Sequence, residues 1–197
     1  MVDKPGVSQV VTGRWQEDSG GGLKGLIFHA RHHDLVVMAR ATKSDGLPED
    51  RLEALLMSCG RPVLIASQRE PRSLLGNVVI CWKETPDAAR AVSAALPLLM
   101  RAKRVALLIV EEGSEPLHEA SDELVRQLAW HGIDADPHVI SRDRRPTADV
   151  LFSTARAHEA DLMVMGGYGH WPVREAMFGG CTQAVLEAAE IPVFLFH

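Results

Sequence analysis

Short apolar runs alternate with amphipathic segments along most of this 197-residue chain. In the second half the predicted strands, each a short run rich in apolar residues, are residues 77–82, 105–110, 133–140, 162–165 and 192–196. The predicted helices between them, which have apolar residues at helical spacing, are residues 85–99, 117–131, 146–158 and 182–190. Strict alternation of strand and helix predicts an α/β fold with a doubly wound, five-stranded parallel sheet.

The front of the chain repeats the end of this pattern. Asp34-Leu-Val-Val-Met resembles Asp161-Leu-Met-Val-Met, and each segment precedes a helix and then a Pro-Val strand. The elements predicted here are a strand within 7–15, a helix at 23–33, a strand at 34–39, a helix at 48–57 and a strand at 62–66. About 70 residues cannot hold five strands of ordinary length. We therefore divide the chain into a partial copy, residues 1–70, and a complete domain, residues 76–197. Because small units bury little surface, the partial copy is expected to be stable only when docked on the complete domain or on another chain.

A glycine-rich loop follows the predicted strand at 162–165. The candidate site comprises Gly166, Gly167, Gly169, Gly179, Gly180, Cys181 and Thr182. Glycine lets backbone N–H groups approach a ligand closely, and a helix N-terminus favours an anion. A strand, a glycine loop and a helix start are therefore typical of phosphate binding in an open α/β sheet. The alternative is a tight turn whose glycines serve packing alone. The partial copy has Ala39 and Thr42 at the positions of Gly166 and Gly169, which predicts no phosphate loop there.

Composition narrows the class of protein. The formal net charge is −5 and no basic tract is present, which argues against a nucleic-acid partner. No apolar run is long enough to span a membrane, and the N-terminus lacks the apolar region of a signal peptide. The three cysteines form no CxxC pair, which is typical of a reducing compartment. We expect a cytoplasmic protein without a metal site, although two of the histidines among 29, 32 and 33 have the helical spacing of metal ligands.

The spacing Gly166-x2-Gly169-x9-Gly179 resembles the phosphate-binding signature of the universal stress protein family, in the branch that binds ATP. The resemblance covers residues 76–197 well and about 28–67 in part, so the chain looks like a tandem-domain member with a truncated first domain. It implies an α/β sandwich of the adenine-nucleotide hydrolase type. It also implies a homodimer, because members commonly dimerise and the last strand often takes part.

Two positions depart from the family pattern. Lys83 stands where ATP-binding members usually carry an Asp near the ribose, and Gly180 stands where the signature has Ser or Thr. The loop after the first strand and the glycine loop should face each other in this sheet, so Lys83 is a candidate for a phosphate contact. The alternative is a solvated lysine beside a helix start.

The resemblance implies a universal stress response protein that dimerises and binds unidentified protein partners, gated by ATP. If a nucleotide binds, with or without Mg, the N–H groups of Gly167, Gly169, Gly180 and Cys181 are expected to hold its phosphates, and Thr182 to add a hydroxyl. We expect no strong catalytic activity and assign no catalytic residue. Two alternatives stay open: a slow Mg-dependent ATP hydrolase that uses the same loop, and a nucleotide-free dimer in which the loop is only structural.

Overall fold

The structure is a computed structural model that describes residues 13, 21–39, 49–67, 73–111, 117–167 and 180–197. Its helices are α1 Gly22–Ala30, α2 Glu49–Cys59, α3 Pro86–Leu99, α4 Leu117–Trp130, α5 Thr147–Ala157 and α6 Gly180–Ala188. Its strands are β1 Val36–Ala39, β2 Val63–Ala66, β3 Asn77–Trp82, β4 Arg104–Glu111, β5 Ala135–Ser141, β6 Leu162–Gly166 and β7 Val193–Phe196. These elements confirm the predicted ones to within three residues at each end, and the strand predicted within 7–15 lies largely outside the described residues.

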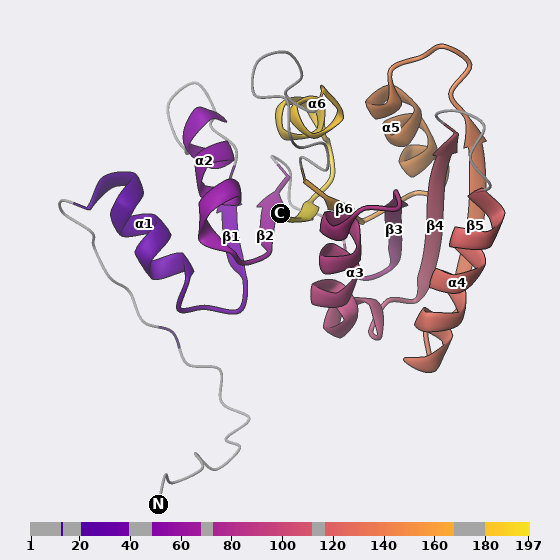
Figure 1. Cartoon of the computed structure of the whole chain (residues 1–197), viewed down its shortest axis with the longest axis horizontal. Helices are drawn as coiled ribbons and strands as arrows, with labels where there is room; N and C mark the ends of the chain where they lie inside the picture. Colours follow the sequence, from indigo (N-terminus) through magenta and orange to yellow (C-terminus); the bar gives the residue numbers. More distant parts are fainter. Residues whose placement is uncertain (1–12, 14–20, 40–48, 68–72, 112–116, 168–179) are drawn as a thin grey trace, which may run out of the picture.

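The strands form one sheet in the order β1-β2-β7-β6-β3-β4-β5 (Figure 1). All neighbouring strands of residues 76–197 pair in parallel, which confirms the doubly wound parallel sheet. The chain runs outward from β3 to β5, then returns to the other side of β3 with β6 and β7. In open α/β sheets, ligands bind at the carboxyl ends of the strands where the order reverses, which here are β3 and β6.

Helices cover the sheet in two layers, each with its own apolar core. α3 and α4 pack on one face, where Ala91, Val92, Leu124 and Leu128 contact inward residues of the central strands. α2, α5 and α6 pack on the opposite face together with α1. Because successive strand residues point to opposite faces, the four apolar residues Leu162 to Met165 of β6 contribute to both cores and are at most 6% exposed. The carboxyl end of β6 is thereby held firmly in the middle of the molecule.

The partial copy joins the complete domain through an antiparallel pairing of β2 with β7. Its elements α1-β1-α2-β2 repeat α5-β6-α6-β7 in register as well as in sequence. Val36 lies opposite Val63 just as Met163 lies opposite Val193. The Val36 N–H donates to the carbonyl oxygen of Pro62 and the Met163 N–H donates to that of Pro192, both at 3.0 Å. One sheet of seven strands therefore runs through both parts, rather than the five strands of the complete domain alone.

The described structure also bears on the expected role of the last strand in a dimer and on membrane-spanning helices. β7 has β6 on one side and β2 on the other, so the last strand offers no open edge to a second copy of the chain within the described structure. Among the described helices, none has the length and apolar character that crossing a bilayer requires.

Candidate functional site

Gly166, the last residue of β6, lies directly against the start of α3. A Cβ atom added to Gly166 would lie 2.5 Å from the backbone nitrogen of Ala88 and 2.7 Å from the backbone carbon of Asp87. Both atoms belong to the first turn of α3. Only glycine allows this helix start to pack directly on the end of β6. The close contact brings the helix that follows β3 against the carboxyl end of β6, at the reversal of the strand order.

The start of α3 is capped by its own residues. Thr85 precedes the helix, and its Oγ1 accepts a hydrogen bond from the Ala88 N–H at 3.2 Å. Its carbonyl oxygen accepts from the Ala89 N–H at 3.1 Å, and the first helical residue, Pro86, has no N–H to offer. The N-terminus of α3 therefore presents few donors to a ligand, and the start of α6 is the more suitable helix terminus.

Gly167 has a different role from its neighbour. Its N–H donates to the carbonyl oxygen of Phe196 at 2.8 Å, and its own carbonyl oxygen accepts from Nδ1 of His197 at 3.1 Å. A Cβ atom here would lie 3.2 Å from Leu56 in α2 of the partial copy. The N–H predicted to hold a phosphate is thus used by the C-terminal strand, and we omit Gly167 from the donor set.

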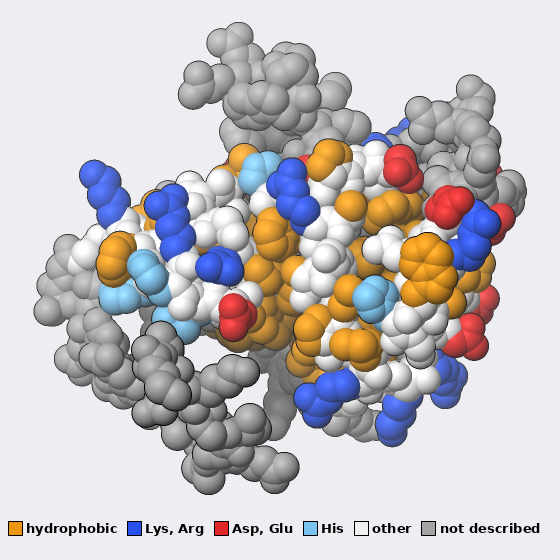
Figure 2. All heavy atoms as spheres, turned by 60° about the horizontal axis from the view of Figure 1, so that its bottom comes forward, with side chains coloured by type: hydrophobic (Ala, Val, Ile, Leu, Met, Phe, Trp, Pro, Cys, Tyr) orange, Lys and Arg blue, Asp and Glu red, His pale blue; other side chains and the backbone are white. Residues whose placement is uncertain are grey.

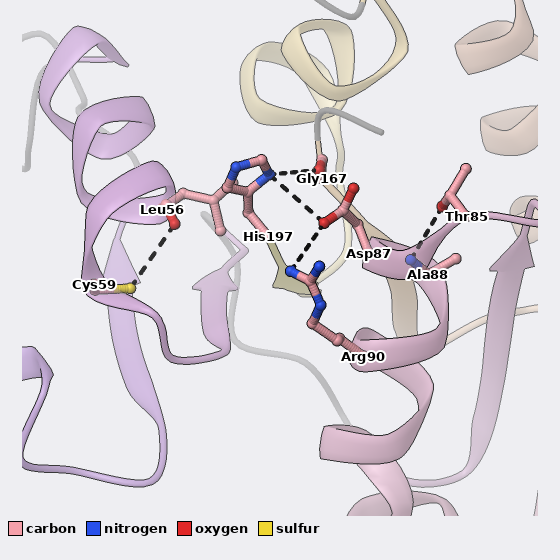
Figure 3. A network of polar contacts seen from close by, with 8 residues as sticks. All are labelled: Leu56, Cys59, Thr85, Asp87, Ala88, Arg90, Gly167 and His197. Carbon is pink, nitrogen blue, oxygen red and sulfur yellow. Dashed lines mark hydrogen bonds and ion pairs between the residues drawn. The ribbon is translucent and has the colours of Figure 1, made fainter. Parts of the chain in front are cut away.

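A small polar network surrounds this point (Figure 3). Asp87, whose side chain is 13% exposed, forms an ion pair with Arg90 at 3.3 Å and lies 3.9 Å from Nδ1 of His197. It connects the start of α3, the end of β6 and the residue after β7. Sequence reasoning missed His197 and Asp87 as parts of the site, because neither belongs to the glycine pattern. The acid in the first turn of α3 was the only signal for Asp87.

The start of α6 lies two residues earlier than predicted, at Gly180. Gly180 is exposed, and no atom of the described residues lies within 4 Å of a Cβ atom added to it. Cys181 is half-buried against the core, and Thr182 is 4% exposed. The side chain of Thr182, which was predicted to add a hydroxyl to the phosphate contacts, therefore lies in the interior. Gly169 and Gly179 lie outside the described residues.

The remaining predicted residue, Lys83, is exposed in the loop between β3 and α3. Cys81 at the end of β3 is 8% exposed. Burial raises the pKa of the Cys81 thiol far above its ordinary range, and the neighbouring Cys181 raises it further. This interaction links the end of β3 to the start of α6. The structure therefore gathers Lys83, Gly166, Gly180 and Cys181 around the carboxyl ends of β3 and β6.

Comparison with solved structures identifies the same fold in other proteins. A universal stress protein of Archaeoglobus fulgidus aligns with a TM-score of 0.68 and 16% identity, over 88% of this chain and 64% of that one. A Pseudomonas aeruginosa protein described as functionally unknown aligns with a TM-score of 0.62 and 17% identity, over 91% of this chain and 68% of that one. A universal stress protein in complex with cAMP aligns with a TM-score of 0.52 and 19% identity, over 64% of this chain and 98% of that one.

The chain thus spans 64% of the length of the archaeal protein that it resembles. No curated protein matches the chain. The model of the universal stress protein family matches residues 76–197, which are the residues of the complete five-stranded domain described above. With this match over more than half of the chain, and with the same fold in solved members, the chain belongs to the universal stress protein family.

Proposed function

We propose that this protein is a nucleotide-regulated interaction module of the stress response, which binds an adenine nucleotide at the carboxyl ends of β3 and β6. The observation that carries the proposal is the direct packing of α3 on Gly166, because it holds the helix that follows β3 against the end of β6, where the glycine loop begins. Ligands of doubly wound sheets bind at such a place. The universal stress protein solved with cAMP is a relative in fold that binds a nucleotide.

The proposed phosphate donors are backbone groups of the glycine loop and of the start of α6. They come from Gly169, Gly179, Gly180 and Cys181, with Lys83 as a cation on the opposite loop. The helix start favours an anion because its first N–H groups point outward and carry partial positive charge. Gly180 suits this role since it is exposed and its Cβ position is clear of the other described residues. ATP is the proposed ligand, with Mg bound through its phosphates.

We assign no catalytic residue to this site, and the proposed role is binding rather than turnover. Burial keeps the Cys81 thiol protonated, which removes its nucleophilic form. Asp87 is held by Arg90 and lies near His197, so its carboxylate has a structural role in this arrangement. A tandem-domain origin with a truncated first domain belongs to the same proposal. It is supported by the repeat of α5-β6-α6-β7 in α1-β1-α2-β2.

Gly180→Asp tests the site, with Gly180→Asn as its control of nearly equal size. Both side chains have room among the described residues, none of which has an atom within 4 Å of the Cβ position. An acid in the first turn favours the helix, so the variant should fold at least as well as the wild type. Two like charges about 6 Å apart in water repel by roughly 0.7 kcal/mol, and ATP carries several. We therefore expect Gly180→Asp to bind ATP about tenfold more weakly than Gly180→Asn.

Isothermal titration calorimetry with ATP, ADP, AMP and cAMP measures the affinities, and phosphate release measures turnover. A nucleotide at 100 times its Kd stabilises the chain by about 2.7 kcal/mol, which raises Tm by roughly 5–10 °C at this chain length. Equal affinity of the two variants would place the phosphates elsewhere. No binding of any of the four nucleotides at millimolar concentration would refute the proposal, and rapid phosphate release would favour the hydrolase instead.

A further inference from the structure

The internal repeat allows one half of the molecule to be compared with the other, residue by residue. Val37 of β1 corresponds to Val164 of β6, and Leu64 of β2 corresponds to Phe194 of β7, with the same register in both strand pairs. A row of side chains runs across the sheet through Val37, Leu64, Phe194, Val164 and Ile80. A side chain of β1 or β2 that is more exposed than its equivalent in β6 or β7 therefore indicates an element that covers the complete domain but not the partial copy.

Burial falls along this row toward β1. Ile80 and Val164 are 0% exposed and Phe194 is 2% exposed, whereas Leu64 is half-buried and Val37 is 60% exposed. The buried residues lie beneath α3, which packs on β6 and β7. The described helices of the partial copy, α1 and α2, pack on the opposite face. Within the described residues, one face of β1 and β2 thus lacks the helix that covers the equivalent strands. Figure 2 shows apolar side chains gathered on the side of the molecule turned forward from the bottom of Figure 1.

Among the described strands, none lies beside β1 on its outer edge (Figure 1). The Val36 N–H donates to Pro62 at the start of β2. Because the polar groups of successive residues in a parallel strand point to opposite sides, those of Val37 point away from β2. In the complete domain the equivalent residue, Val164, pairs with Ile80 of β3. The edge is four residues long and has no charged side chain or proline, the features that usually prevent pairing at an open edge.

A third difference lies at the start of the same strand. Asp161 precedes β6, and its Oδ2 accepts a hydrogen bond from the Asn77 N–H at the start of β3, at 2.8 Å. Its equivalent, Asp34, is exposed and makes no hydrogen bond to another residue of the described structure. A carboxylate therefore stands at the amino end of β1 in the position that, in the complete domain, binds the first N–H of the neighbouring strand.

From these three differences we infer that the edge and open face of β1 and β2 form a docking surface for a strand–helix unit. The partner strand runs parallel to β1 and forms hydrogen bonds with the backbone N–H and C=O of Val37. The first N–H of the partner strand donates to the Asp34 carboxylate. The helix that follows it covers Val37 and Leu64 with a face of small apolar residues. That face has the character of Ala88, Ala91, Val92 and Ala95 in α3, which are at most 4% exposed where α3 packs on the sheet. The surface and the nucleotide site lie on different parts of the sheet, so either can fail without the other.

The probe is the strand–helix unit of this chain itself, residues 74–102, attached to a carrier protein and added to the full-length chain. We expect saturable binding and at least tenfold slower amide hydrogen exchange at Val37, whereas Val36 is already protected by its bond to Pro62. The same probe with Ala91→Asp and Ala95→Asp, which charges the covering face of the helix, should bind at least tenfold more weakly.

Two variants of the chain test the two kinds of contact. Val37→Pro removes the outward N–H and leaves the bonds of β1 to β2, since proline is tolerated on an edge strand. Asp34→Ala removes the carboxylate from an exposed position. Each should weaken probe binding at least about tenfold. Phe28→Lys is the matched control, because Phe28 is 61% exposed but belongs to α1. The Phe28→Lys variant should bind the probe like the wild type. If Val37→Pro lowers Tm, Val37→Lys replaces it, with the same expected loss.

The outcomes separate the possible occupants. Binding that depends on Val37 and Asp34, but not on Phe28, supports the proposal. No slowing of exchange at Val37 under saturating probe overturns it. Self-association of the wild type that Val37→Pro abolishes, measured by light scattering without the probe, also overturns it, because the occupant would then be the β1 edge of a second copy.

Discussion

Gly166→Ala is the substitution that most directly tests the packing on which the site depends. The added methyl group would lie 2.5 Å from the Ala88 nitrogen, 2.7 Å from the Asp87 carbonyl carbon and 2.9 Å from the Ala88 Cα. Favourable contacts between heavy atoms lie near 3.5–4.0 Å, so the first turn of α3 must move by about 1 Å. All three atoms are backbone atoms, and no side chain can rotate away to relieve the overlap.

Extra atoms forced into a packed region cost about 1–3 kcal/mol. For a chain of this length each kcal/mol lowers Tm by about 2–4 °C, so Gly166→Ala should lower Tm by roughly 2–12 °C. Thermal unfolding followed by circular dichroism measures the change. Gly180→Ala is the control, because its Cβ position has no atom within 4 Å in the described part of the chain and alanine is the better helix former. A Gly166→Ala protein that melts within about 1 °C of the wild type would refute the packing argument.

Three further predictions concern stability and thiol chemistry. Asp161→Ala should cost about 1–2 kcal/mol because it removes the carboxylate bonded to the N–H at the start of β3, whereas Asp34→Ala should leave Tm unchanged; equal losses in thermal unfolding would contradict the assigned difference. Thr85→Ala should cost about 1 kcal/mol through loss of the α3 cap, and Thr85→Ser should restore most of it in urea unfolding. Cys181 should react with a thiol reagent in the folded protein, whereas Cys81 should react only on unfolding, which mass spectrometry of the labelled chain can check. Since the pKa of Cys81 is higher in the folded chain, its contribution to stability is present below about pH 8 and is lost as pH rises further.

The proposed nucleotide site and the proposed docking surface lie on different parts of one sheet. The proposed nucleotide site lies at the carboxyl ends of β3 and β6, and the docking surface lies at the outer edge of β1. Gly167 lies between the complete domain and the partial copy, since its N–H donates to Phe196 and its Cβ position would lie 3.2 Å from Leu56 of α2.

Much of the fold followed from local pattern. The alternation of apolar strands with amphipathic helices predicted the parallel sheet, because burial on both faces requires continuous apolar runs such as Leu162 to Met165. The match between Asp34-Leu-Val-Val-Met and Asp161-Leu-Met-Val-Met predicted the repeat, and the equal register of the two strand pairs agrees with it. The glycine spacing indicated the family, and the match of the family model to residues 76–197 established membership.

The roles of individual residues needed the tertiary structure. Gly166 and Gly167 are adjacent in the same glycine run. Gly166 accommodates the start of α3, whereas Gly167 forms a hydrogen bond with Phe196 at the end of β7. The antiparallel pairing of β2 with β7 could not be predicted from the sequence either. This pairing occupies the edge of β7 that was expected to take part in a dimer. The physical reason is the same in each case. Periodicity reports which side of an element is buried, whereas these contacts join residues that are dozens of positions apart and depend on which elements become neighbours.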